Sequence, residues 1–280
     1  MSNITRTRLV TTLAVASVAL GLAGCSADST PSTSDSGAGS AAASDGLSLA
    51  EVQDAGELVI GTEGTYRPFS FHEGGTGNLT GYDIEIVTAV ADKLGVDPVF
   101  EETQWDAIFA GLDSGRIDMI ANQVSITPER QADYSFSAPY TVSPGVLIVA
   151  DDTTDITSFD DLAGHTSAQS LNSNWYTLAE DSGADVQAVE GWAEAAELLR
   201  QGRVDATIND ELTFLDYEKT EGDTGLKIVA EADEVSDNAF AFRQGSDDLV
   251  AAVDTALDEL RADGTLASIS DKYFGADVSQ

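Results

Sequence analysis

A cluster of polar residues near the middle of the chain has the composition of an anion-binding site. The stretch from Asn122 to Arg130 contains amides, hydroxyls and a guanidinium, and it ends in Ser125-Ile126-Thr127-Pro128-Glu129-Arg130. Thr127 followed by Pro128 is typical of a helix start, with threonine as the N-cap and proline at the first helical position. Backbone N–H groups at a helix start and the planar fork of Arg130 would suit a carboxylate. A capped helix with a surface arginine is the alternative interpretation.

A second pattern occurs twice in the chain, at the same internal spacing. Trp105 precedes Gly115-Arg116-Ile117-Asp118 and Asn122, and Trp192 precedes Gly202-Arg203-Val204-Asp205 and Asn209. Apolar residues at helical spacing follow each tryptophan, each glycine stands where a helix would end, and a short apolar strand follows. Two such units predict two similarly built α/β lobes. A coincidental match is the alternative interpretation. The strands would end in Asn122-Gln123 and in Asn209-Asp210, and ligands of open α/β sheets bind beyond such ends.

The sequence outside these two units predicts further helices and strands that would position them. A strand is expected at residues 57–61, and an amphipathic helix with Ile84, Val87, Ala91 and Leu94 on one face would end at Gly95. Residues 249–260 predict a second amphipathic helix. Two crossings between the lobes, near residues 141–146 and 235–240, would form a two-strand hinge. We therefore expect lobe 1 at residues 47–142 plus 238–280 and lobe 2 at residues 143–237.

The N-terminal segment predicts export and lipid attachment. Arg6 and Arg8 precede an apolar run that is too short to be a convincing membrane span, and Leu22-Ala23-Gly24-Cys25 follows it. Leu-Ala-Gly-Cys resembles the lipobox of bacterial lipoproteins, which implies cleavage after residue 24 and acyl chains on Cys25 that anchor the protein without a spanning helix. An ordinary secreted protein is the alternative. Residues 25–46 would form the lipid anchor and a disordered tether, because they are rich in Ser, Ala, Gly, Thr and Asp.

Composition limits the remaining possibilities. The chain has 49 acidic and 13 basic residues and a formal net charge of −36, which opposes binding to nucleic acid and to anionic lipid. Cys25 is the only cysteine, and His72 and His165 are the only histidines, so neither a disulfide nor a metal site is expected. No cofactor is expected either. A phosphate loop of the form G-x-x-x-x-G-K-[ST] does not occur, so any ATP hydrolysis must be done by another protein.

Several motifs, in one order along the chain, resemble the polar amino-acid binding proteins of ABC importers, the family 3 solute-binding proteins. The resemblance covers roughly residues 47–274. It implies an α/β, two-lobed fold of the periplasmic-binding-protein type II ("Venus flytrap") with a two-strand hinge. It rests on Gly61-Thr62-Glu63-Gly64-Thr65-Tyr66-Arg67-Pro68-Phe69, Gly81-Tyr82-Asp83-Ile84-Glu85, Ser125-Ile126-Thr127-Pro128-Glu129-Arg130 and Phe136-Ser137-Ala138-Pro139-Tyr140.

The family resemblance also implies a role for individual residues. Arg130, helped by the backbone at Ser125, would hold the α-carboxylate of an amino acid, and Asp210 in the other lobe would take its ammonium group. Tyr66 and Trp105 would form aromatic walls, with a place in the core as the alternative for both. Glu63 would face a polar end of the ligand, unless it is a turn carboxylate, and Asp210 could instead cap the following helix.

Within the family, the chain resembles the cystine-binding subgroup. The similar segments are Glu102-Thr103-Gln104-Trp105-Asp106, Ala121-Asn122-Gln123-Val124, Ala168-Gln169-Ser170-Leu171-Asn172-Ser173-Asn174, and Ala206-Thr207-Ile208-Asn209-Asp210 leading to Phe214-Leu215-Asp216-Tyr217. Cystine has two zwitterionic ends. A second set of polar groups, formed by Asn122, Gln123, Asn172, Asn174 and Glu63, is therefore chemically reasonable.

These observations predict a monomeric, lipid-anchored receptor on the extracytoplasmic face of the cell membrane. It would close two lobes around L-cystine and deliver it to an ABC permease that is driven by a separate ATPase. Binding of another polar amino acid is the nearest alternative. A cyclohexadienyl-dehydratase-like enzyme with Glu63 as the general acid is another, and a sensor subunit is a third.

Overall fold

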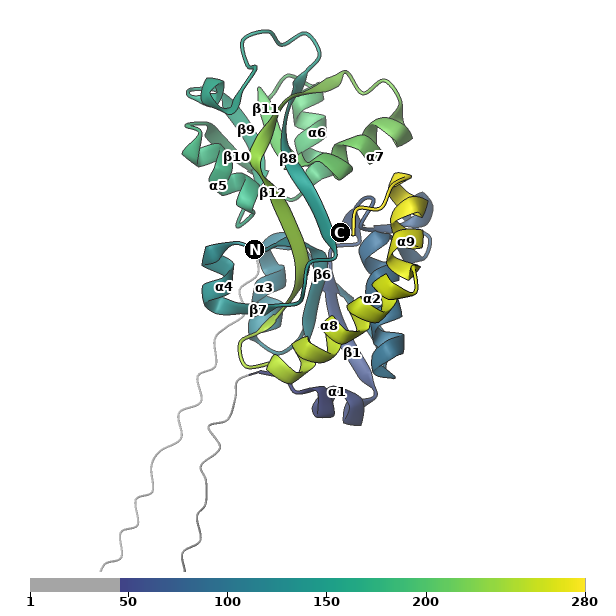
Figure 1. The fold of residues 1–280 in the computed structure, drawn as a ribbon. Coiled ribbons are helices and arrows are strands. Elements are labelled where there is room, and N and C mark those ends of the chain that lie inside the picture. The colour runs from purple at the N-terminus through teal and green to yellow at the C-terminus, as the bar shows by residue number, and fades with distance from the viewer. Residues whose placement is uncertain (1–45, 280) are drawn as a thin grey trace, which may run out of the picture. The chain divides into compact units, whose positions relative to one another are not determined.

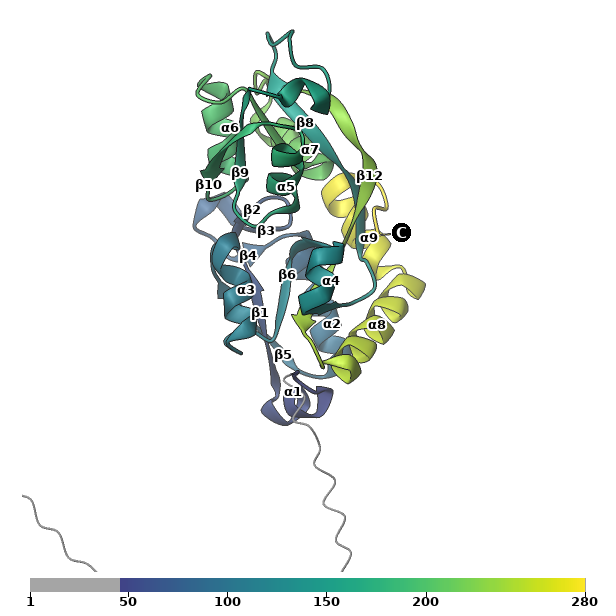
Figure 2. The ribbon, with the colours of Figure 1, turned by 90° about the vertical axis from the view of Figure 1, so that its left-hand side faces the viewer.

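The computed structural model describes residues 46–279. The predicted signal peptide, Cys25 and all but the last residue of the tether lie outside this range. The described part is an α/β fold with two lobes, shown from two sides in Figures 1 and 2. The family resemblance predicted this fold class, and it is confirmed. The lobe boundaries given above remain a prediction.

Lobe 1, as the name is used below, comprises the elements from α1 to β7 together with α8 and α9. Its helices are α1 (Leu49–Ala55), α2 (Tyr82–Leu94), α3 (Trp105–Asp113), α4 (Pro128–Asp133), α8 (Asp247–Ala262) and α9 (Thr265–Phe274), with the 3-10 turn η1 (Glu73–Gly75). Its strands are β1 (Glu57–Thr62), β2 (Thr65–Tyr66), β3 (Ser70–His72), β4 (Leu79–Thr80), β5 (Asp97–Glu102), β6 (Met119–Ser125) and β7 (Tyr134–Phe136).

Lobe 2 comprises the elements from the 3-10 turn η2 to α7. They are η2 (Phe159–Leu162), β9 (Thr166–Ser170), α5 (Asn174–Asp181), β10 (Asp185–Val189), α6 (Trp192–Arg200), β11 (Ala206–Asp210) and α7 (Glu211–Glu221). Two long strands, β8 (Thr141–Ala150) and β12 (Leu226–Arg243), connect the lobes. The two predicted crossings therefore correspond to one antiparallel pair, in which Ser143 lies opposite Ser236.

One sheet passes through both lobes, in the order β10-β9-β11-β8-β12-β6-β1-β5, with β7 paired to β12. In lobe 1, β1 lies parallel to β5 and β6, and in lobe 2, β9 lies parallel to β10 and β11. Each half of the sheet has a buried apolar cluster on both faces. Layers on both sides of a parallel sheet bury its backbone polar groups and its apolar side chains together.

Local sequence explains where the main helices stop. The α2 face with Ile84, Val87, Ala91 and Leu94 is buried, and the helix ends at Gly95 with a φ of 77°. A β-carbon is disfavoured in this left-handed conformation, so glycine is the residue that ends the helix there. Within the described residues, no helix is long and apolar enough to span a membrane.

The two repeated units adopt the same local structure in the two lobes. Trp105 is the first residue of α3 and Trp192 the first residue of α6, and each helix is followed by a strand, β6 or β11. The aspartates of the two units make equivalent bonds: Asp118 Oδ2 accepts the Val59 N–H at 2.9 Å, and Asp205 Oδ2 accepts the Thr166 N–H at 2.8 Å. The repeat is therefore a structural unit that fastens the helix–strand turn to the neighbouring strand.

Candidate functional site

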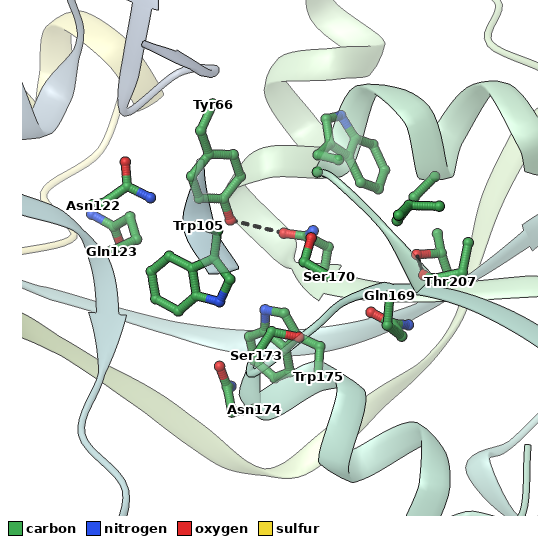
Figure 3. Close-up of a pocket in the computed structure, with 16 residues that line it drawn as sticks. Tyr66, Trp105, Asn122, Gln123, Gln169, Ser170, Ser173, Asn174, Trp175 and Thr207 are labelled. Atoms are coloured by element: carbon green, nitrogen blue, oxygen red, sulfur yellow. Dashed lines mark hydrogen bonds between the residues drawn. The ribbon is translucent and has the colours of Figure 1, made fainter. Parts of the chain in front are cut away.

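A cavity lies between the lobes, and its walls come from the strand ends and helix starts that the repeat predicted. It encloses about 510 Å³, open space at its mouth included. Figure 3 shows its lining side chains. Lobe 1 contributes Tyr66, Trp105, Asn122 and Gln123, and lobe 2 contributes Ala168, Gln169, Ser170, Ser173, Asn174, Trp175, Val189, Gly191, Trp192, Ala195, Thr207 and Asn209.

Aromatic side chains form much of the cavity wall. The repeated tryptophans, Trp105 and Trp192, are only 7% and 8% exposed and line the cavity from opposite lobes. Trp175 lies over the hinge strand at Gly145, where an added β-carbon would be 2.3 Å from the indole ring. Glycine at that position is therefore required for the indole to lie against β8.

Hydrogen bonds cross from one lobe to the other beside this cavity. The Tyr66 hydroxyl donates to Asn209 Oδ1 at 2.9 Å, drawn as a dashed line in Figure 3, and accepts from Thr213 Oγ1 at 3.1 Å. At the rim, Gln104 Nε2 donates to Glu190 Oε2 at 2.6 Å. These bonds require the lobes to be close together.

A charged pair also joins the lobes outside the cavity. Arg67 Nε lies 3.4 Å from Asp216 Oδ2, and its guanidinium carbon lies 3.8 Å from the centre of the Phe71 ring. Arg67 belongs to the loop after β2, whereas Asp216 belongs to α7. The Arg67–Asp216 pair and the Gln104–Glu190 bond are called the interlobe latch below.

Arg130 lies beside the cavity rather than among its lining residues. It is the third residue of α4, whose N-cap is Thr127 and whose first residue is Pro128, as the sequence predicted. Its Nη1 donates to the Ser125 carbonyl at 2.9 Å, and its Nη2 donates across the lobes to the Asn172 carbonyl at 3.0 Å. Burial lowers the pKa of Arg130 to about 10, so the group stays charged at neutral pH.

The surroundings of Arg130 restrict where its guanidinium can lie. The guanidinium carbon is 5.2 Å from the centre of the Trp105 ring and 5.5 Å from that of Phe109, which is within cation–π range. Asn172 has a φ of 61°. It is an exposed residue and does not line the cavity. Asn172 therefore contacts Arg130 through its carbonyl group instead of its amide.

Glu63 and Asn122 form a joined polar pair. Asn122 Nδ2 donates to Glu63 Oε2 at 2.6 Å, while Asn122 Oδ1 accepts the Glu63 N–H at 2.9 Å. Burial is the main cause that raises the pKa of Glu63 to about 7, and Asp106 adds to it. Glu63 lines a more open crevice next to the cavity, together with Tyr66, Gln104 and Glu190 among others.

Asp210 is buried at the end of β11, next to Asn209, which lines the cavity. It is the N-cap of α7, so its Oδ1 accepts the Leu212 N–H at 2.9 Å, and it also accepts the Ser143 hydroxyl at 2.7 Å. Burial raises the pKa of Asp210 to about 6. The capping role that the sequence left open is therefore present, and the carboxylate has no cationic partner in an ion pair of the described residues.

The ten predicted ligand-binding residues occupy three kinds of place. Five line the cavity: Tyr66, Trp105, Asn122, Gln123 and Asn174. Four adjoin it through their bonds: Glu63, Ser125, Arg130 and Asn172. Asp210 lies deeper, below Ser143 of the hinge. Their roles toward a ligand remain predictions.

Sequence reasoning missed several lining residues. Trp192 was noticed only as a member of the repeat, Asn209 only as part of the repeat and of a subgroup motif, and Gln169 and Ser170 only as part of a subgroup motif. Trp175 gave no signal beyond its place after Asn174. Within the described residues, no group of three or more His, Cys, Asp or Glu could hold a metal ion.

Comparison with known proteins gives consistent results over nearly the whole described chain. The sequence model of the bacterial extracellular solute-binding proteins, family 3, matches residues 58–276. The L-cystine-binding protein TcyA of Bacillus subtilis (strain 168) is 49% identical over 238 residues, which are 85% of this chain and 88% of that protein.

Two solved structures show how the lobes compare. The L-cystine solute receptor of Neisseria gonorrhoeae, in an unliganded open conformation, is 46% identical and has a TM-score of 0.56, covering 83% of this chain and 99% of that one. An ancestral arginine-binding protein bound to arginine is only 36% identical but has a TM-score of 0.73, covering 79% and 99%. The more distant sequence is thus the more similar structure. Hydrogen bonds and an ion pair join the lobes in the present structure, and this arrangement is called closed below.

Proposed function

Because the chain belongs to the bacterial extracellular solute-binding proteins of family 3, we propose that it captures L-cystine between its two lobes for an ABC importer. The observation that supports this most directly is the cavity between the lobes, which is lined by tryptophans and neutral amides and has a buried guanidinium, Arg130, and a buried carboxylate, Asp210, next to lining residues. A zwitterion requires a fixed cation and a fixed anion, because an unpaired charge is costly in a dry site.

In this proposal Arg130 and the Ser125 backbone hold the α-carboxylate, and Asp210 receives the ammonium group. The guanidinium has five N–H donors, and two of its nitrogens donate to carbonyl groups in the closed form, so donors remain for a ligand. The tryptophans and Tyr66 pack against the ligand's apolar atoms. Glu63, Asn122, Gln123 and the amide of Asn174 serve the second zwitterionic end of cystine, and Asn172 contributes by binding Arg130 through its carbonyl group.

A thermal-shift screen over the standard amino acids and L-cystine tests this proposal. A tight ligand raises the melting temperature by mass action, so L-cystine should give the largest increase. A larger shift with another amino acid would replace cystine as the ligand, and no shift with any of them would remove amino-acid binding altogether.

Catalysis is the rival that one observation supports, since Glu63 has a pKa near neutrality and could act as a general acid. We propose that it does not do so, because Asn122 holds its carboxylate in a bond that a reacting group would have to replace. Incubation with arogenate or prephenate distinguishes the two functions: turnover would favour the enzyme, and unchanged substrate would favour the receptor.

We also propose that acyl chains on Cys25 anchor the mature protein on the extracytoplasmic face of the membrane. The support is the sequence pattern of a basic start, an apolar run and Leu22-Ala23-Gly24-Cys25. Cys25→Ser should release the protein into the soluble fraction of cells that express it. Unchanged membrane attachment of that variant would refute the anchor. The monomeric state and the permease partner are part of the same proposal.

A further inference from the structure

Strand β6 contains an irregularity at the point where it reaches the cavity. In its pairing with β12, Val124 lies opposite Ala239 and Ile120 opposite Ala241. Three residues of β6, Ala121 to Gln123, therefore face the single residue Phe240. Such a β-bulge bends a strand and redirects its side chains, and bulges are common next to binding sites.

The backbone at Gln123 shows what the bulge requires. Its φ is 49°, and among the described residues only Gln123 and Asn172 are non-glycine residues with a positive φ. A residue with a β-carbon pays a cost in that conformation, so surrounding contacts must hold it there. Both residues lie at the site described above. Gln123 lines the cavity, and the carbonyl group of Asn172 accepts a hydrogen bond from Arg130.

Asp83 supplies the contacts that hold Gln123. Its Oδ2 accepts the Gln123 backbone N–H at 2.8 Å, and its Oδ1 accepts the Gln123 side-chain Nε2 at 2.6 Å. One carboxylate thus binds both donors of the same residue, which fixes its backbone and its side chain together. Gln123 Nε2 also lies 3.2 Å from Thr141 Oγ1, at the start of the hinge strand β8.

Asp83 is an unusual residue in its position. It is the second residue of α2 and is fully buried within lobe 1. The helix N-terminus favours its negative charge, but burial still raises its pKa to about 7, so the carboxylate is costly to keep there. An apolar side chain would avoid that cost but could not accept the two bonds from Gln123.

The bulge has a direct consequence for the cavity. Successive side chains of a regular strand point to opposite faces, yet Asn122 and Gln123 both line the cavity and are drawn together at its edge in Figure 3. Asn122 in turn holds Glu63 through two hydrogen bonds. Contacts therefore run from Asp83 to Gln123, along the strand to Asn122, and on to Glu63.

We propose that Asp83 is a positioning residue for ligand binding: by holding Gln123 in its left-handed conformation, it places Asn122 and Glu63 at the cleft. This inference rests on the proposed function, since it assumes that the cleft binds an amino acid. Asp83 itself does not line the cavity. Its effect on the ligand passes through the backbone of β6.

The test compares the effect of Asp83→Asn in the wild type with its effect in a Gln123→Gly background. Asparagine offers one acceptor oxygen in place of two, so one donor of Gln123 loses its partner, and ligand affinity should fall about ten- to hundredfold. In a Gln123→Gly background, adding Asp83→Asn should cost little further affinity, because glycine adopts a positive φ without the bonds from Asp83 and has no amide to satisfy. Asp92→Asn, on the exposed side of the same helix, is the matched control and should bind like the wild type.

Calorimetric titration with L-cystine measures these affinities, and circular dichroism verifies the fold of each variant. Wild-type affinity in folded Asp83→Asn would overturn the proposal, and so would a loss of affinity on adding Asp83→Asn to Gln123→Gly that equals the loss in the wild-type background. If the wild type prefers another amino acid, the ligand assignment fails, and the same comparison is made with that amino acid.

A second pair of variants covers the case in which Asp83→Asn does not fold. Gln123→Ala and Gln123→Gly remove the same side-chain amide, but only alanine keeps the backbone strain. With Asp83 intact, Gln123→Ala should bind about fivefold more weakly than Gln123→Gly. Equal affinities would show that the left-handed conformation is not what the site depends on.

Discussion

Arg130 is a buried cation that is held by hydrogen bonds to carbonyl groups and by aromatic side chains. Its guanidinium donates hydrogen bonds to carbonyl groups of both lobes and lies near Trp105 and Phe109, and it forms no ion pair within residues 46–279. A buried cation of this kind is stabilised when an anion arrives. A ligand carboxylate would therefore complete the local electrostatics of the closed cleft.

Arg130→Ala should reduce ligand affinity by about a hundredfold or more, since the loss of a buried charged partner costs roughly 2–5 kcal/mol. The fold should survive, because Arg130 belongs to a short helix beside the cleft. Calorimetry gives the affinity, and Arg200→Ala, an exposed arginine on α6, is the control. Near-normal affinity of Arg130→Ala would remove this residue from the site.

Asp210 should show opposite effects on stability and on binding. Asparagine keeps the Oδ1 that accepts from Leu212 and Ser143, but it removes a buried charge whose pKa is raised by burial. Asp210→Asn should therefore raise the melting temperature of the unliganded protein at pH 7.5 and lower ligand affinity about ten- to hundredfold. Melting curves with and without ligand measure both effects. An unchanged ligand-induced shift would show that Asp210 does not receive the ammonium group.

At the scale of elements, the interlobe latch should control how readily the lobes close. Arg67 and Asp216 come from different lobes and do not line the cavity, so they bias the closed arrangement without a direct contact to the ligand. A change in the closed population changes the apparent affinity of every ligand by the same factor.

Asp216→Asn should therefore weaken all ligands equally, by about two- to fivefold, as expected for a partly exposed ion pair. Dissociation constants for the best ligand and for one weaker amino acid would be measured at low and high salt. Asp258→Asn disrupts a pair within one helix, α8, and should leave both constants unchanged. A change in the ratio between the two ligands would mean that Asp216 acts on the ligand itself.

Local sequence was a good guide to most elements and a poor guide to pairing. The C-terminal end of α2 and the start of α4 could be predicted, because glycine and threonine–proline signals act within a few residues. Of strand β12, a crossing near residues 235–240 was expected, whereas the strand runs from Leu226 to Arg243. Its pairing with β8, which shifts register between Ile228 and Ala230 and between Glu231 and Val235, is a long-range effect that overrides local propensity.

The cleft could be predicted in outline but not in detail. The motifs identified Tyr66 and Trp105, which line the cavity, because sequence carries residue type directly. The β6 bulge at Gln123 and its bond to Asp83 depend on packing between distant segments, so no local pattern indicates them. Gln169 and Trp175 were missed for the same reason, since their places follow from the packing of lobe 2.

For the whole molecule, buried acids should make stability depend on pH. Burial raises the pKa of Glu63 and Asp83 to about 7 and that of Asp210 to about 6, whereas unfolded carboxyls titrate near pH 4. The folded state thus holds protons that the unfolded state has released. Between about pH 4 and pH 7 the free energy of unfolding should fall as the pH rises.

Denaturant unfolding of the unliganded protein at pH 5.5 and pH 7.5, at constant ionic strength, measures this dependence. The protein should be more stable at pH 5.5, and Glu63→Gln should have a smaller difference between the two values, since glutamine does not titrate. Greater stability at pH 7.5 than at pH 5.5 would contradict the raised pKa values of these buried acids.

The most direct test of the central claim is a calorimetric titration of the mature chain with L-cystine, in competition with L-arginine. We expect one cystine per chain and an affinity about tenfold or more above that for arginine, a difference of at least ~1.4 kcal/mol. Tighter binding of arginine would contradict the assignment of the ligand. The absence of heat and of competition with either compound would contradict an amino-acid receptor.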